Sequence, residues 1–166
     1  MNHKENFLQT KNGKITVGVL ASAGIALVVY LLTAKLLHWK PFNIKTLTTK
    51  DIDNLKVDIT DFTGKTKKDD ISQDTAKKEA QKAVDAIKKI IDAFTENNKA
   101  DDKDKKIAST TMDSANALKT KADAALKFAN DASTWEDAQV VDFVSKMVKT
   151  TDINNILSQA KTDLKL

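Results

Sequence analysis

The chain contains no cysteine and no arginine, and all 27 of its basic residues are lysines. Without cysteine it can form no disulfide, no thiol nucleophile and no thiolate metal site. Without arginine it lacks the planar guanidinium that binds phosphate, guanine or carboxylate through two parallel hydrogen bonds. These absences count against sequence-specific nucleic-acid binding and against an enzyme that relies on an arginine finger.

Glycine and histidine are also scarce where catalysis would need them. Residues 41–166 contain a single glycine, Gly64, which excludes glycine-rich phosphate loops and nucleophile elbows from this region. The two histidines, His3 and His38, are not spaced as a pair of metal ligands. The acidic cluster at 101–104 is interleaved with lysine and lacks the glycine and terminal glutamate of an EF-hand. We therefore predict a non-enzymatic chain with no catalytic, cofactor-binding or metal-binding residue.

One long run has no charged residue, from Ile15 to Ala34. As a helix it would span about 30 Å, the thickness of the hydrocarbon core of a bilayer. A cleaved secretory signal would have an apolar core of about 7–15 residues followed by a small-residue cleavage site, and neither is present here. The sequence predicts an uncleaved single-pass membrane protein, with a polar tail over 1–14 and a transmembrane helix with its interfacial flank over 15–40.

Lysines and a tryptophan border this run, which is typical of side chains at a membrane interface. The predicted interfacial anchors are Lys14, Lys35, Trp39 and Lys40. Residues 1–40 carry five lysines and one glutamate, whereas residues 41–166 carry 22 lysines and 22 acidic residues, so the net charge of +4 lies around the run. Because lysines follow the run as well as precede it, the positive-inside rule gives no orientation.

Small residues recur every four positions along the predicted membrane helix, at Gly18, Ser22 and Ala26. Such spacing lets two helix backbones approach closely in lipid, where packing replaces the hydrophobic drive. We predict that this face packs a second helix, either from another copy of the chain or from a partner. The alternative is that the small residues are incidental and the helix is only an anchor.

The next stretch, a connector over residues 41–69, has two competing patterns. Leu55, Val57 and Ile59 alternate as in a strand, while Ile52, Leu55, Ile59 and Phe62 recur as on one face of a helix. A lone strand would have no partner, because the remaining sequence offers no second strand. The connector is therefore predicted to be a short helix or an extended segment.

Residues 70–166 are rich in alanine, lysine and aspartate, and four amphipathic helices are predicted there. The first runs from about Ser72 to Glu96, with Asp70 or Ser72 as its cap, and the second from about 102 to 132. The first carries a coiled-coil-like seam whose apolar residues are spaced three and four apart: Ala76, Ala80, Ala83, Ile87, Ile90 and Phe94. The second has an alanine-rich face that would allow close packing.

A capping box at Ser133-Thr134-Trp135-Glu136 predicts a third helix over about 134–149, with Thr151 or Asp152 capping a fourth. The third would bury Val140, Val141, Val144, Met147 and Val148, and the fourth Ile153, Ile156, Leu157, Ala160 and Leu164. The predicted fold is all-α, a single N-terminal transmembrane helix followed by a small antiparallel bundle of three to four helices over 70–166 that folds alone. The seam on the first helix is either the core of this bundle, which we favour, or a docking surface.

Two functional classes fit this organisation, with a third behind them. The first is a membrane-anchored structural or tethering protein that acts as a scaffold, its helical domain contacting other proteins in a membrane-associated assembly. The second is a virus-particle membrane protein that scaffolds a shell against its bilayer. The third is an accessory subunit of a membrane enzyme or transport complex. In each, the expected partners are the lipid bilayer and other proteins, including a second copy of the chain, and not nucleic acid.

Overall fold

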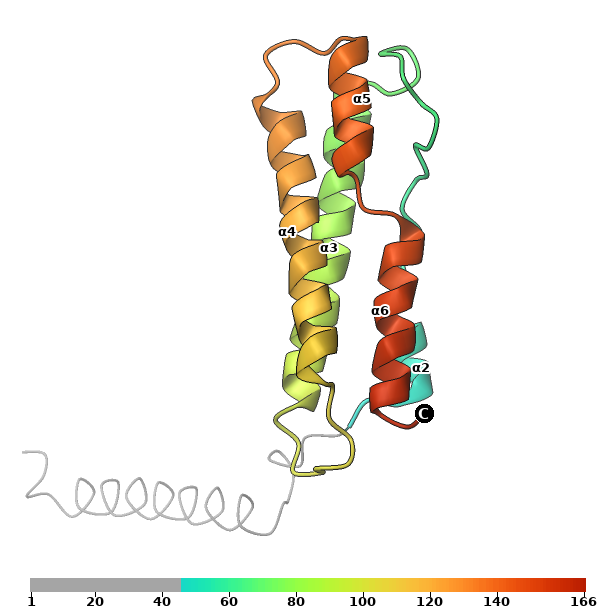
Figure 1. Cartoon of the computed structure of the whole chain (residues 1–166), viewed down its shortest axis with the longest axis vertical. Helices are drawn as coiled ribbons and strands as arrows, with labels where there is room; N and C mark the ends of the chain where they lie inside the picture. The colour runs from blue at the N-terminus through green and yellow to red at the C-terminus, as the bar shows by residue number, and fades with distance from the viewer. Residues whose placement is uncertain (1–45) are drawn as a thin grey trace, which may run out of the picture. The chain divides into compact units, whose positions relative to one another are not determined.

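The structure is a computed structural model that describes residues 46–166. This part of the chain is a helical bundle without strands, as the sequence predicts (Figure 1). Its helices are α2 (Thr49–Asp53), α3 (Gln73–Asn97), α4 (Ser109–Asp131), α5 (Asp137–Lys146) and α6 (Thr150–Asp163).

The two longest helices, α3 and α4, pack side by side and antiparallel along the length of the bundle (Figure 1). α3 begins where the sequence predicts, because the Ser72 Oγ accepts a hydrogen bond from the Thr75 N–H (3.2 Å). The buried face of α4 is largely alanine, so the two backbones can approach closely. That face comprises Thr111, Ala115, Ala122, Ala125 and Ala129.

The prediction that the second long helix begins near residue 102 is wrong, because α4 begins at Ser109. The side chains of two asparagines at the end of α3 hold the intervening loop. Asn97 Nδ2 donates to the Lys105 carbonyl (2.9 Å), and Asn98 pairs with both the N–H (2.7 Å) and the carbonyl (3.0 Å) of Ile107. These side-chain contacts take up backbone groups that a longer helix would have used.

A distant carboxylate stabilises the start of α4. Ala108 occupies the N-cap position and has no side chain that can cap the helix. Asp163, at the end of α6, instead accepts hydrogen bonds from the Ala108 N–H (3.0 Å) and the Thr111 hydroxyl (2.6 Å). The carboxylate also suits the positive end of the helix dipole. The start of α4 is therefore fixed by a residue far away in sequence.

The third side of the bundle is divided between α5 and α6, which follow one another and run antiparallel to α4 (Figure 1). The helix predicted from the Ser133 capping box begins three residues later than expected, with Glu136 as its N-cap and Gln139 Oε1 accepting from the Glu136 N–H (3.1 Å). It also ends earlier, at Lys146, because Met147 adopts an extended conformation.

The predicted apolar faces of these two helices are mostly correct. All five residues predicted for the fourth helix are buried, four of them on α6 and Leu164 directly after it. On α5, Val144 is only partly buried, and Val141 is 48% exposed, so its prediction as a core residue is wrong. Phe143, which the sequence pattern did not single out, is fully buried instead. Successive residues of a helix point about 100° apart, and on α5 Val140 faces the core while Val141 faces away from it.

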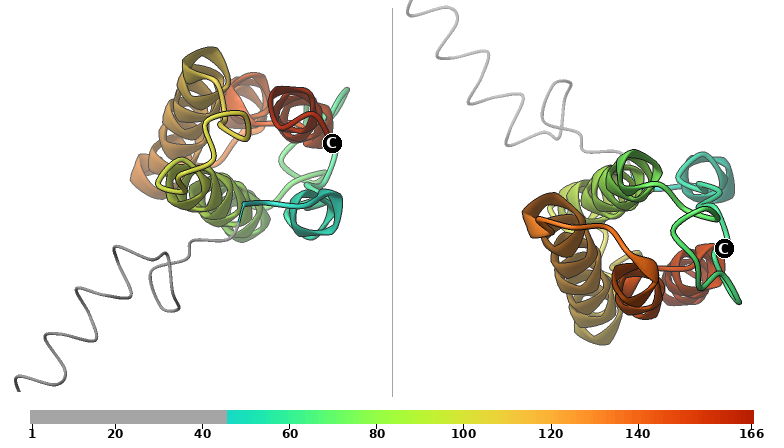
Figure 2. Two further views of the ribbon diagram at one scale, coloured as in Figure 1. Left: turned by 90° about the horizontal axis from the view of Figure 1, so that it is seen from below. Right: turned by 90° about the horizontal axis from the view of Figure 1, so that it is seen from above.

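The fourth side is formed by residues 46–72, which contain α2 and then an extended segment (Figure 2). A capping box between Thr48 and Asp51 starts α2. The ambiguous stretch of the sequence thus contains both predicted forms, a short helix followed by extended chain. Ile52, Ile59 and Phe62 are buried in the same core as the long helices, so residue 70 does not mark the edge of the packed region.

Candidate interaction surfaces

The seam predicted on the first long helix faces the interior of the bundle. Five of its residues, Ala80, Ala83, Ile87, Ile90 and Phe94, are at most 1% exposed. They share one hydrophobic core with the alanines of α4 and with side chains of α5 and α6. In this structure the seam residues pack the bundle together and present no outward surface.

The residues predicted to pack or anchor a membrane helix lie outside the part of the chain that the structure describes: Gly18, Ser22, Ala26, Lys14, Lys35, Trp39 and Lys40. Within residues 46–166, none of the helices combines the length and the apolar character needed to cross a bilayer. The anchor therefore stays a prediction from the sequence.

Carboxylates are plentiful in the bundle but are not arranged as a metal site. Across residues 46–166 no three histidine, cysteine or carboxylate side chains come together as metal ligands could. In the acidic loop, Asp102 Oδ1 accepts a hydrogen bond from the Asp104 N–H (3.0 Å), which is the pattern of an Asx turn. This loop uses the Asp102 side chain to shape its own backbone.

An open groove of about 470 Å³ lies between the C-terminal half of α4 and α5. The half-buried ring of Phe128 lies at this groove, and the Lys146 Nζ lies 5.4 Å from the ring centroid, within cation–π range. The groove is lined by Ala124, Lys127, Phe128, Asp131, Ala132, Ser133, Thr134, Gln139 and Lys146. We call it the α4–α5 groove.

The charges around the α4–α5 groove are unequal. Lys127 is paired with Asp131, and this hydrogen-bonded ion pair raises the pKa of Lys127. Lys146, by contrast, has no carboxylate of residues 46–166 within ion-pair distance, and its ammonium group rests against the Phe128 ring. The groove thus combines an aromatic surface with one cation that still has capacity for an acidic group. This arrangement suits an apolar side chain that lies beside a carboxylate.

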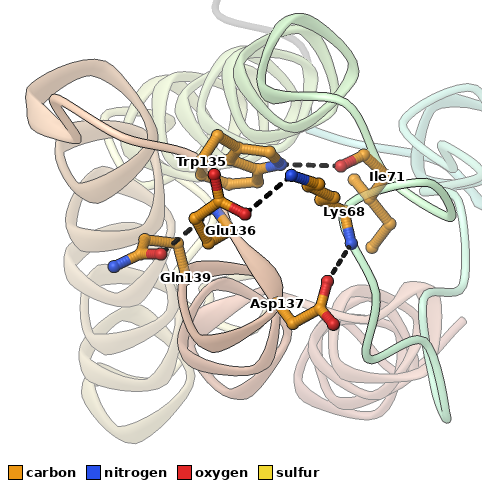
Figure 3. Close-up of polar contacts among 6 residues, drawn as sticks. All are labelled: Lys68, Ile71, Trp135, Glu136, Asp137 and Gln139. Carbon is orange, nitrogen blue, oxygen red and sulfur yellow. Dashed lines mark hydrogen bonds and ion pairs between the residues drawn. The ribbon is translucent and has the colours of Figure 1, made fainter.

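A cluster of polar contacts joins the segment before α3 to the corner between α4 and α5 (Figure 3). The Lys68 Nζ lies 2.8 Å from Glu136 Oε2, and the Lys68 N–H donates to Asp137 Oδ1 (2.9 Å). The hydrogen bond to Glu136 raises the pKa of Lys68. Because both side chains of the ion pair are half exposed or more, the pair adds little stability of its own. The pair joins the segment before α3 to the start of α5 at this corner.

Trp135 fixes the same corner from the inside (Figure 3). Its indole N–H donates to the Ile71 carbonyl (2.7 Å), and its ring meets the Phe143 ring edge-on at 5.8 Å. The Phe62 ring also packs against Phe143, with the ring centroids 6.0 Å apart. Three aromatic side chains from distant parts of the sequence thus meet around Phe143.

A second open groove, of about 630 Å³, runs along the outer face of α3 beside Val57. Its charged lining alternates in sign, with Lys78, Lys82, Lys88 and Lys89 interspersed with Asp85 and Asp92. Such a surface is well solvated and has no strong preference for one sign of partner. We therefore regard the α4–α5 groove as the better candidate for contact with another protein.

Ion pairs at the other end of the bundle hold α2 in place. Asp53 lies 2.8 Å from both Lys161 of α6 and Lys56. The hydrogen bonds from Lys161 and Lys56 lower the pKa of Asp53 to about 2. The carboxylate is therefore charged at neutral and mildly acidic pH.

Comparison of the chain with protein-family models and with curated proteins found no match. Candidate functions therefore depend on the sequence and geometry of this chain alone.

The sequence does not predict that Phe128 and Lys146 of the α4–α5 groove lie together. Phe128 is recognisable as bulk beside the alanine face, but Lys146 is one lysine among many. Their approach depends on the turn between α4 and α5, whose geometry is set by Trp135 and Glu136. No local sequence signal could have paired them.

Proposed function

We propose that this chain is a non-enzymatic, membrane-anchored tethering protein whose helical bundle contacts other proteins of a membrane-associated assembly. The observation that carries the proposal is the charge-free run from Ile15 to Ala34, joined in one chain to a bundle with its own core over residues 46–166. A charge-free run of this length suits the bilayer, and a packed bundle suits a role outside it.

The composition supports a binding role over a catalytic one. The sequence of the bundle contains no histidine, cysteine or arginine, and its single glycine, Gly64, leaves no phosphate-binding loop. Histidine, the side chain used most often as a general base, and the cysteine thiol nucleophile are thus missing from this region. Contacts with other proteins need only shape, apolar surface and charge, which the outside of the bundle supplies.

Within this proposal, the α4–α5 groove is the surface through which the bundle holds its partner. The Phe128 ring would receive an apolar side chain, and Lys146 would pair with a neighbouring carboxylate. Aromatic and cationic side chains at the centre of a contact surface commonly contribute most of the binding free energy.

Site-specific photo-crosslinking of the full-length chain in its native membrane tests this proposal. A crosslinker at Ala124, in the groove, is compared with one at Thr95, an exposed position of α3 outside it. We expect one recurring protein neighbour at Ala124 only, and its loss when Lys146→Glu reverses the charge at the groove. Lys103→Glu, the same charge reversal in the α3–α4 loop, serves as the matched control. Equal capture at both positions, or capture unaffected by Lys146→Glu, would contradict the proposal.

A further inference from the structure

The segment from Leu55 to Asp70, which we call the strap, covers the core between α3 and the α5–α6 side without forming a helix or a strand (Figure 2). It occupies the position that a fourth long helix would fill in a four-helix bundle. Only two of its side chains, Ile59 (5% exposed) and Phe62 (8% exposed), are buried. The strap therefore covers a helix-sized side of the core with few buried residues.

Both ends of the strap are attached firmly. Before it, α2 is held by the fully buried Ile52 and by the ion pair between Asp53 and Lys161. After it, Ile71 is 1% exposed and its carbonyl accepts the Trp135 indole N–H. The strap is thus a loop between two fixed points, and Gly64 with φ +79° supplies a left-handed residue within it.

Between these points the strap is attached to the helices only through side chains. Within the described residues, no backbone–backbone hydrogen bond joins the strap to α3, α4, α5 or α6. The Thr150 hydroxyl accepts from the Ile59 N–H (2.8 Å) and donates to the Ile59 carbonyl (3.1 Å). The Thr60 N–H donates to Glu79 (3.2 Å), and Lys68 makes the two exposed contacts with Glu136 and Asp137 described above.

These observations separate the strap from the helices in local stability. Regions open at low free energy when they have few buried apolar contacts and many solvent-exposed hydrogen bonds. Ordering the backbone of a loop also costs conformational entropy. In the strap this cost is offset by two buried side chains, Ile59 and Phe62, and by the partly buried Leu55 and Val57 that pack against the core. α3 and α4, by contrast, have continuous internal hydrogen bonds and a shared buried face.

We propose that the strap is a releasable cover, which opens as one unit while α2 and the helices α3 to α6 stay folded. Opening lifts Phe62 from Phe143 and exposes the apolar side of the core beneath it. This inference does not depend on the proposed tethering function.

Thiol labelling of the folded, full-length chain tests the proposal, because the chain has no cysteine and an introduced one is unique. Ile59→Cys places the thiol in the strap and Ile87→Cys places it in the core of α3, and both positions are buried. We expect Ile59→Cys to react at least about 100-fold faster than Ile87→Cys in the absence of denaturant, as local opening requires. Equal rates that both follow global unfolding would overturn the proposal.

Hydrogen exchange of the unmodified chain provides the second measurement, because the cysteine could itself loosen the strap. Strap amides should exchange at least about 100-fold faster than the central amides of α3 and α4, and this difference should disappear only near the global unfolding transition. The amides of Ile59 and Thr60 are the informative ones, since each donates a hydrogen bond to a helix side chain. Protection of these two amides equal to that of α3 would overturn the proposal whatever the labelling result.

Discussion

The α3–α4 pair and the opposite side of the bundle are built in different ways. α3 and α4 are consecutive in sequence, long, and packed through an apolar seam against alanines. The opposite side combines α2, the strap, α5 and α6, and its contacts join residues far apart in sequence, such as Ile59 with Thr150 and Asp53 with Lys161. The first side depends mainly on periodicity and local contacts, whereas the second depends on individual long-range contacts.

This difference predicts how strongly substitutions on each side should change the free energy of unfolding. A seam of fully buried residues on a long helix distributes the packing over many side chains, so damage at its centre affects the whole bundle. On the opposite side, the buried residues are divided among short helices and the strap, so each substitution there acts on a smaller packed unit. Substitutions on the two sides should therefore differ in size, and the following experiments compare them.

The largest effect is expected from Ile87→Asp at the centre of the α3 seam. Ile87 is 0% exposed, so the substitution places a charge without a partner in an apolar core, at a cost of more than about 4 kcal/mol. Since small domains are stable by about 5–15 kcal/mol, we expect loss of cooperative thermal melting by circular dichroism. Lys88→Asp, at the exposed neighbouring position, is the control and should melt almost as the parent does. Cooperative melting of the Ile87 variant would place this residue outside the core.

Phe143→Ala should have the next largest effect and tests the opposite side. The ring is 0% exposed and contacts both Phe62 and Trp135, so its removal should cost about 3–5 kcal/mol. Val141→Ala, at an exposed position of the same helix, should change the free energy of unfolding by less than about 0.5 kcal/mol. Urea titration of both variants measures this. Equal losses would show that α5 does not pack as described.

Ala115→Leu tests the close approach of α3 and α4. Ala115 is 0% exposed in the interface, and three additional side-chain carbons there should destabilise the bundle by about 1–3 kcal/mol through overpacking. Ala117→Leu, at an exposed position two residues further along α4, should be within about 0.5 kcal/mol of the parent. If Ala115→Leu were neutral or stabilising in urea titrations, the interface would be looser than the structure indicates.

The smallest expected effect concerns the ion pairs of Asp53 and the pH dependence of stability. Because its pKa is lowered from 3.8 to about 2 in the folded state, Asp53 contributes stability that is fully present above pH 4 and lost as the pH falls through about 2. Asp53→Asn should therefore be slightly less stable than the parent at pH 6, and the difference should shrink at pH 2. A difference in urea midpoint that stayed constant between these pH values would contradict this role.

The α3–α4 pair was predictable from the sequence because its determinants are local. The spacing of Ala80, Ala83, Ile87, Ile90 and Phe94 marks the buried face of α3, and Ser72 marks its start. The start of α4 was missed because Asp163 caps it from the end of α6, and the start of α5 was missed because Trp135 is held by the Ile71 carbonyl. Both contacts join residues far apart in the sequence, so the spacing of apolar and capping residues near each helix start does not reveal them.

The candidate surface was less predictable than the fold. The α4–α5 groove depends on where Lys146 lies relative to Phe128, which follows from the corner at Trp135 and Glu136 and not from residue spacing. The buried role of Ile52, Ile59 and Phe62 was equally hidden, since their sequence pattern fits a helix and a strand alike. Where the periodicity fits both a helix and a strand, the sequence does not show which residues are buried, because that depends on the helices they pack against.

The central claim, that this bundle works from a membrane anchor, is tested most directly by alkaline carbonate extraction of the full-length chain from its native membrane. The charge-free run predicts that the chain stays with the membrane pellet, because a spanning helix is not released by disrupting polar contacts. Replacing Leu20 and Val28 together with lysine should move it to the supernatant, since charges within such a run oppose insertion. Recovery of the unmodified chain in the carbonate supernatant would contradict the account.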